Sequence, residues 1–156
     1  MTDDSLTPST EPTNGGSRLL LCDDSPVERL ALGHLLRRAG YRVDEAGDGQ
    51  SAILHLKHRP IDLLLLDLQM PEVDGFDVLS YLQQHRPGLP VILLSGMPPD
   101  QIQHSMHRMP SKELPPLFIK PVDPERLLEV VELQLAGELP GPSAYPPAPS
   151  DETRSR

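Results

Sequence analysis

Hydrophobic and polar positions along the chain follow two alternating periods. Short apolar runs, typical of buried strands, alternate with stretches in which apolar residues recur every three or four positions, as on one face of a helix. The runs that predict strands are 18–22, 41–46, 61–66, 91–94 and 117–119. The stretches that predict helices are 26–39, 51–58, 76–84 and 124–135. Residues 98–109 predict one more short helix, followed by an irregular loop over 110–116.

The helical stretches also predict which side chains face the interior. Ser25 and Pro26 together favour a helix start, and Gly40 favours its end. We expect the inward residues to be Val27, Leu30, Ala31, Leu35 and Leu36 in the first helix, Phe76, Leu79 and Leu82 in the third, and Leu127, Leu128, Val131 and Leu135 in the last. In the short helix over 98–109 the shared apolar face would carry Ile102, Met106 and Met109.

Five alternations of strand and helix predict an α/β protein with a parallel sheet covered by helices on both faces. Residues 61–66 are apolar at nearly every position, as a strand buried on both faces must be. We therefore expect a flavodoxin-like (βα)5 fold, a doubly wound five-stranded parallel sheet with strand order 2-1-3-4-5. The folded domain is predicted at 17–136.

Both ends of the chain contain few apolar residues that could be buried. Residues 1–16 are mostly Ser, Thr, Pro, Asp, Glu and Gly, and residues 137–156 are rich in proline. Such segments cannot offset the entropy cost of ordering, so we expect two disordered tails. The proline-rich tail is either a terminus or a truncated linker.

Composition narrows the function classes. The formal net charge of -9 argues against binding of nucleic acid or an anionic membrane surface. The single cysteine, Cys22, excludes an internal disulfide and fits a small core residue in a reducing compartment. No apolar stretch approaches the roughly 18 residues that span a bilayer, and the acidic N-terminus does not resemble a signal peptide. A cytoplasmic location is expected.

Polar residues stand at the carboxyl ends of the predicted strands. Asp23 and Asp24 follow the first strand, Asp67 the third, Ser95 the fourth and Lys120 the fifth. In parallel sheets these ends meet at one edge, where ligands bind. Carboxylates suit a hard cation such as Mg²⁺, and lysine and serine suit a phosphoryl oxygen. A carboxylate can also act as the nucleophile toward phosphorus.

Five motifs along the folded region resemble those of the receiver domain of two-component response regulators. They are the acidic pair Asp23-Asp24, the turn 45–52, the segment 62–76 around Asp67, the pair Ser95-Gly96 and the closing Phe118-Ile119-Lys120-Pro121. Because all five occur in order at compatible spacings, the resemblance is specific and covers the whole folded region. The chain resembles a stand-alone receiver.

The resemblance implies a role for each site residue. Asp67 would accept a phosphoryl group from a phosphohistidine. Asp24, Asp67 and the main-chain carbonyl of Gln69 would bind Mg²⁺ directly, and Asp23 would act largely through water. Lys120 would pair with the phosphoryl group, and the Ser95 hydroxyl would move toward it.

The resemblance further implies the partners and the mode of action. The donor would be a sensor histidine kinase or a histidine phosphotransfer protein, and the downstream protein is unknown. Phosphorylation would change the conformation and so alter partner binding. Such a chain is a switch that catalyses its own phosphorylation and dephosphorylation, rather than an enzyme. The Lys120-Pro121 peptide bond would be cis.

One position departs from the family pattern. The residue three before Lys120, usually an aromatic switch, is Leu117. Phe118 is one position away and should face the other side of the strand. The usual coupling between the hydroxyl residue and an aromatic ring is therefore not expected here.

Several other polar residues have structural interpretations. Asp48 and Asp74 are expected to be turn or helix-cap residues, and His104 and His107 to be surface side chains rather than metal ligands. Two alternative functions also remain. The chain could be a constitutive protein-binding module that never uses its aspartate, or a Mg²⁺-dependent aspartyl-phosphate hydrolase. Gln69 disfavours the hydrolase, because such enzymes commonly have an acid two positions after the nucleophile.

Overall fold

The structure is a computed structural model that describes residues 16–70, 74–97, 100–101, 115–138 and 144–145. The described strands are β1 (Arg18–Cys22), β2 (Arg42–Ala46), β3 (Leu63–Asp67), β4 (Val91–Ser95), β5 (Leu117–Ile119) and β6 (Ala144–Tyr145). The described helices are α2 (Pro26–Arg38), α3 (Gly49–His58), α4 (Gly75–His85) and α6 (Pro124–Leu135). Apart from those of β6, these bounds lie within two residues of those predicted from the sequence.

All strands pair in parallel, in the order β2-β1-β3-β4-β5-β6. The first five strands confirm the predicted order and the flavodoxin-like fold. The sixth was not predicted: Ala144 and Tyr145 pair with Leu117 and Phe118 at the outer edge of β5. Its two residues are too few for a periodic signal, and the prolines around them favoured a tail.

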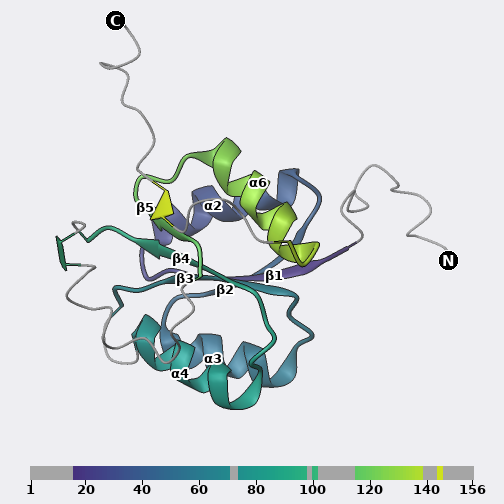
Figure 1. Ribbon diagram of the computed structural model, residues 1–156, viewed down its shortest axis with the longest axis vertical. Helices are drawn as coiled ribbons and strands as arrows, with labels where there is room; N and C mark the ends of the chain where they lie inside the picture. The colour runs from purple at the N-terminus through teal and green to yellow at the C-terminus, as the bar shows by residue number, and fades with distance from the viewer. Residues whose placement is uncertain (1–15, 71–73, 98–99, 102–114, 139–143, 146–156) are drawn as a thin grey trace, which may run out of the picture.

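The sheet forms a middle layer between two layers of helices (Figure 1). Helices α2 and α6 cover one face, and α3 and α4 cover the other. Each face has its own hydrophobic cluster, because successive side chains of a strand point to opposite faces. In β3, Leu63 and Leu65 belong to the cluster under α2 and α6, whereas Leu64 and Leu66 belong to the one under α3 and α4.

Most of the predicted inward residues are buried or partly buried, but the prediction for α2 was partly wrong. Val27 and Leu30 are 77% and 68% exposed, and Ala31 is exposed as well. The buried face of α2 carries Leu36, as predicted, together with Gly33, which was not predicted. A hydrophobic pattern cannot identify Gly33 as an inward position, so the face was assigned to the more apolar side.

Gly33 is inward because α2 lies close to β2 at this point. A Cβ atom on Gly33 would lie 2.9 Å from Oε2 of Glu45 and 3.2 Å from a guanidinium nitrogen of Arg37. The Glu45 carboxylate in turn pairs with Arg37 at 3.0 Å and with Arg29 at 3.4 Å. The close contact between α2 and β2 therefore combines a missing side chain with two ion pairs.

Helices α2, α3 and α4 begin at residues that were predicted as caps or turns. The Ser25 hydroxyl accepts a hydrogen bond from the Glu28 amide, and Asp48 accepts one from the Ser51 amide. Asp74 forms a reciprocal capping box with Asp77 at the start of α4. Each cap satisfies amides that have no partner within the helix, which confirms the structural interpretation of Asp48 and Asp74.

The two large side chains of β5 face opposite sides of the sheet, as predicted. Leu117 lies in the cluster under α3 and α4, and Phe118 is fully buried in the other. The Lys120-Pro121 peptide bond is cis, as the resemblance implied.

The predictions for Ile102, His104, Met106, His107 and Met109, and for the loop up to residue 114, lie outside the described residues. In the part of the chain that is described, no helix has the length and apolar character needed to cross a bilayer.

Candidate functional site

Four neighbouring strands bring the predicted site residues to one edge of the sheet. Asp67 and Ser95 are the last residues of β3 and β4, Asp23 directly follows β1, and Lys120 directly follows β5. The register aligns these ends, because Cys22 pairs with Leu66 and Ser95 with Ile119. Residues far apart in the sequence therefore meet, as the predicted topology requires.

Three carboxylates form the negative part of the site. One carboxylate oxygen from each of Asp23, Asp24 and Asp67 lies within 4.8 Å of the others. Asp23 is fully buried, Asp67 is 2% exposed, and Asp24 is open to solvent. Three like charges at this separation repel one another strongly, so the ionised cluster needs positive charge nearby.

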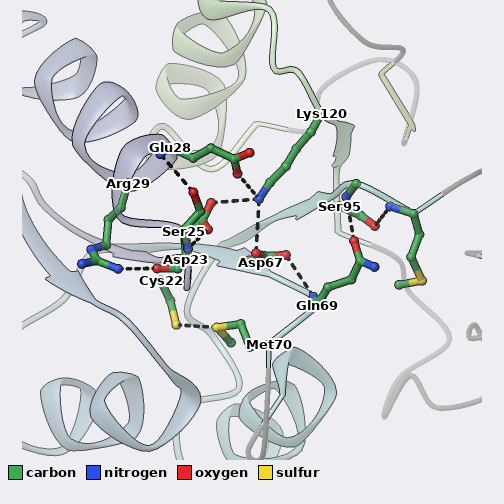
Figure 2. A network of polar contacts seen from close by, with 12 residues as sticks. Cys22, Asp23, Ser25, Glu28, Arg29, Asp67, Gln69, Met70, Ser95 and Lys120 are labelled. Carbon is green, nitrogen blue, oxygen red and sulfur yellow. Dashed lines mark hydrogen bonds and ion pairs between the residues drawn. The ribbon is translucent and has the colours of Figure 1, made fainter.

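Lys120 supplies positive charge to two members of the cluster, Asp23 and Asp67 (Figure 2). Its ammonium lies 2.9 Å from Oδ2 of Asp23 and 3.2 Å from Oδ2 of Asp67. A third carboxylate, that of Glu28 in the first turn of α2, lies closest to it at 2.6 Å. Burial lowers the pKa of Lys120. The hydrogen bonds with Glu28 and Asp23 and the charge of Asp67 raise this pKa by a larger amount, so it lies above its usual value.

Glu28 was missed by the sequence analysis. The available signal was an acidic residue in the first turn of a helix that begins directly after two strand-end aspartates. That position usually indicates a favourable interaction with the helix dipole, and nothing in the spacing shows that its side chain reaches Lys120.

Burial dominates the electrostatics of Asp67. It raises the pKa of Asp67 to about 6, and the nearby charge of Asp23 acts in the same direction. The Gln69 amide, which donates to Oδ1 at 2.9 Å, and the Lys120 ammonium both lower the pKa. Asp67 is therefore mostly ionised at neutral pH, and a bound divalent cation would favour the ionised form further.

Local hydrogen bonds hold the loop that carries Asp23. The Ser25 amide donates to Oδ1 of Asp23 at 2.9 Å, which leaves Oδ2 for Lys120. The guanidinium of Arg29 donates to the main-chain carbonyl of Asp23 at 2.6 Å. Arg29 thus connects the site to Glu45 on β2, a second contribution that the sequence analysis missed.

Gln69 and Ser95 link the loops that follow β3 and β4. The Gln69 side-chain oxygen accepts a hydrogen bond from the Gly96 amide at 3.0 Å. The fully buried Ser95 hydroxyl accepts one from the Met97 amide at 3.0 Å. In this state the hydroxyl oxygen is held by its own loop.

Cys22 lies beneath the site and differs from it chemically. Its sulfur is 3.4 Å from the sulfur of Met70, and the side chain is fully buried. Burial, followed by the charges of Asp67 and the neighbouring aspartates, raises the pKa of the thiol to about 12. Cys22 is therefore a neutral core residue, as predicted.

The start of α4 packs directly against the backbone of Asp67. A Cβ atom on Gly75 would lie 2.7 Å from the Asp67 carbonyl oxygen and 2.7 Å from Cα of Leu68. Only glycine fits this approach without displacement of the backbone. The glycine that follows the Asp67 segment therefore has a packing role in the site.

The donor set determines which chemistry the site can support. Three carboxylates without histidine or thiolate favour a hard, oxygen-binding cation, and a cluster with an open side can leave coordination positions for phosphate oxygens. A neighbouring ammonium can bind a transferred anionic group. The geometry suits phosphoryl chemistry at a carboxylate.

Comparison with known proteins agrees with this geometry. The family model of the response regulator receiver domain matches residues 19–132. The transcriptional regulatory protein GlrR of Escherichia coli is 32% identical over 126 residues, which are 80% of this chain and 27% of that protein. The gliding motility regulatory protein of Myxococcus xanthus is 41% identical over 83 residues, or 51% of this chain and 11% of that protein. The chain thus spans less than a third of either relative.

Solved structures show the same architecture. The signal receiver domain of an HD domain-containing protein from Pseudomonas fluorescens is 27% identical, with a TM-score of 0.68 over 78% of this chain and 96% of that one. A response regulator receiver protein from Pseudomonas putida is 29% identical, with a TM-score of 0.64 over 74% and 95%. The family match, which covers most of the chain, shows that this protein belongs to the response regulator receiver domains of two-component systems.

Proposed function

We propose that this chain is a phosphorylation-controlled switch in which Asp67 accepts the phosphoryl group. The donor is a phosphohistidine on a sensor histidine kinase or a histidine phosphotransfer protein. One observation carries the proposal: the buried carboxylate of Asp67 belongs to the acidic cluster and lies 3.2 Å from the ammonium of Lys120. An ionised carboxylate with positive charge at hand is a suitable nucleophile toward phosphorus.

In the transfer, a carboxylate oxygen of Asp67 forms a bond to phosphorus while the bond between phosphorus and the donor imidazole breaks. The electron pair of the broken bond stays on the imidazole nitrogen. Lys120, already within 3.2 Å of Asp67, stabilises the negative charge on the phosphoryl oxygens. Only the ionised form of Asp67 can attack, so the Mg²⁺-dependent transfer should weaken at low pH, where protonation of this buried carboxylate removes the nucleophile.

The same residues fit a bound Mg²⁺. Asp24 and Asp67 would be direct ligands together with the main-chain carbonyl of Gln69, and Asp23 would act largely through water. The exposure of Asp24 supports this assignment, because it keeps one side of the cluster open to waters and phosphate oxygens. When bound, Mg²⁺ supplies positive charge to both the attacking carboxylate and the transferred group.

The response to phosphorylation would begin at Ser95. Its hydroxyl is held by the Met97 amide in the present state, so a move toward the phosphoryl group would break this contact and shift the loop after β4. Because Leu117 stands at the usual aromatic position, the shift would act through the loop and the apolar contacts of Leu117. The changed surface would alter the binding of a downstream protein.

The experiment compares two aspartates at opposite ends of β3. Asp67→Asn and Asp62→Asn each remove one carboxylate, and Asp62 is an exposed residue that accepts a hydrogen bond from the Arg18 amide. Each protein is incubated with acetyl phosphate and Mg²⁺, and phosphoryl addition is followed by intact mass. We expect labelling of the wild type and of Asp62→Asn, and none of Asp67→Asn.

Other outcomes would favour the alternatives. Equal labelling of Asp67→Asn and wild type would refute Asp67 as the acceptor. Failure of the folded wild type to take up phosphate would favour a constitutive binding module. Continued turnover of a small phosphate ester, rather than one phosphoryl group per chain, would favour the hydrolase.

A further inference from the structure

Glu28 makes the shortest contact of the Lys120 ammonium, although none of the five family motifs includes it. The two groups are 2.6 Å apart, compared with 2.9 Å for Asp23 and 3.2 Å for Asp67. Figure 2 shows the Glu28 side chain extending from the first turn of α2 over the site toward Lys120. The contact therefore joins a helix that begins next to the acidic cluster to the lysine at the end of β5.

The contact with Glu28 uses a hydrogen-bond donor of Lys120 that a phosphoryl oxygen would need. A lysine ammonium has three N–H groups, and here three carboxylates accept from it. A phosphoryl oxygen that bonds to Lys120 must therefore displace one of them. The proposed chemistry cannot proceed with all three contacts intact.

The three carboxylates differ in how easily they can leave. Asp23 is fully buried and held by the Ser25 amide, and Asp67 carries the phosphoryl group itself. The Glu28 side chain is 49% exposed and can turn into water at little cost in solvation. Glu28 is the partner that the phosphoryl group would replace.

We propose that Glu28 competes with the transferred phosphoryl group for the Lys120 ammonium and thereby slows the phosphorylation of Asp67. The inference rests on the proposed function and assigns Glu28 as a positioning residue that acts through Lys120. In the unphosphorylated protein Glu28 holds the ammonium and neutralises it. Phosphorylation breaks this ion pair and leaves the Glu28 carboxylate free in solvent.

The test replaces glutamate by uncharged glutamine, in the wild type and in a Lys120→Met background. Glu28→Gln removes the charge and keeps the shape, and Glu129→Gln removes an exposed charge on α6 as the matched control. Initial rates of labelling by acetyl phosphate with Mg²⁺ are measured by intact mass. We expect Glu28→Gln to be labelled about two- to fivefold faster, the range for a partly exposed ion pair, and Glu129→Gln to match the wild type.

A double-mutant cycle separates competition from simple repulsion of the anionic donor. If Glu28 acts through Lys120, then Glu28→Gln should not change the rate in a Lys120→Met background. If Glu28 only repels acetyl phosphate, the same acceleration should persist there. Glu28→Asp, which keeps the charge on a shorter side chain, should fall between the wild type and Glu28→Gln.

Two results would overturn the inference: an unchanged rate in Glu28→Gln, or an acceleration that persists without Lys120. Both are distinct from failure of the proposed function, in which the wild type would not be labelled at Asp67 at all. Thermal unfolding of each variant checks the fold, and we expect little change because Glu28 lies half in solvent.

Discussion

At the scale of single residues, the proposed phosphoryl acceptor Asp67 is expected to lower the stability of the fold. Burial and the nearby Asp23 raise its pKa to about 6, so the unbound protein carries an unfavourable charge above that pH. We expect Asp67→Asn to raise the melting temperature at pH 7.5 in EDTA by several degrees, on the order of 1 kcal/mol. The control is Asp62→Asn, which should have a small effect because Asp62 is exposed.

The same prediction has a defined pH dependence. In the unfolded chain Asp67 ionises near its ordinary pKa of about 4, and in the folded protein only near 6. Its contribution to stability is therefore lost as the pH rises from 4 to 6 and stays lost above. The advantage of Asp67→Asn should shrink when unfolding is measured at pH 5, and an equal advantage at both values would contradict the assignment.

Cys22 offers a second test at this scale. Its thiol is fully buried and its pKa is raised to about 12, so almost no thiolate is available at pH 8. We expect iodoacetamide to modify Cys22 very slowly in the folded protein and readily in denaturant. Rapid modification of the native protein, followed by mass spectrometry, would show that β1 opens locally.

At the scale of elements, the approach of α4 to β3 determines the position of Asp67. The Cβ of Gly75→Ala would lie 2.7 Å from two backbone atoms of the Asp67 segment, so the helix or the strand end must shift. We expect a loss of about 1–3 kcal/mol in denaturant unfolding and slower labelling by acetyl phosphate. Gly88→Ala, where a Cβ meets nothing within 4 Å, is the matched control.

The short strand β6 leads to another prediction about an element. The Lys120 amide bonds to β4, and because amides alternate along a strand, those of Leu117 and Ile119 face β6. In a chain that stops at residue 138, hydrogen exchange should become faster at these two amides. The Phe118 amide, which faces β4, should keep its rate, and no difference between the two sets would argue against β6.

Elements differ in how far the sequence predicts them. Strands and helices with clear periods were placed within two residues, because their apolar runs are bounded by glycine, proline and capping residues. The predicted orientation of α2 about its axis was wrong at Val27 and Leu30, because the inward position is a glycine, Gly33, that packs against Glu45. Ion pairs that depend on tertiary contact, such as that of Glu28 with Lys120, leave no periodic signal.

At the scale of the whole molecule, cation binding should stabilise the entire fold. The acidic cluster exists only when β1 and β3 are paired, so the proposed Mg²⁺ would bind the folded state in preference to the unfolded one. We expect the melting temperature of the wild type to rise with Mg²⁺ concentration and to fall again in EDTA. Asp67→Asn should lose most of this response, and an undiminished response in that variant would place the cation elsewhere.

The strand order explains why the site residues could be predicted together. Once β1 and β3 are neighbours in a parallel sheet, the carboxyl ends of the strands must bring Asp23, Asp67 and Lys120 to one edge. What topology does not determine is the hydrogen bonding within that edge. The contacts of Gln69 with Gly96 and of Arg29 with the Asp23 carbonyl depend on loop conformations that a single sequence does not encode in any simple pattern.

The absence of a side chain at Gly33 affects the functional site as well as the packing of α2. A methyl group there would press on Glu45, whose partner Arg29 also holds the Asp23 carbonyl. Any displacement of that guanidinium would weaken its hydrogen bond to the loop that carries Asp23 and Asp24. Substitutions of Gly33 are thus expected to impair phosphorylation, although the side chains proposed to contact the phosphoryl group are unaltered. A genetic screen for variants that no longer respond to phosphorylation should recover them.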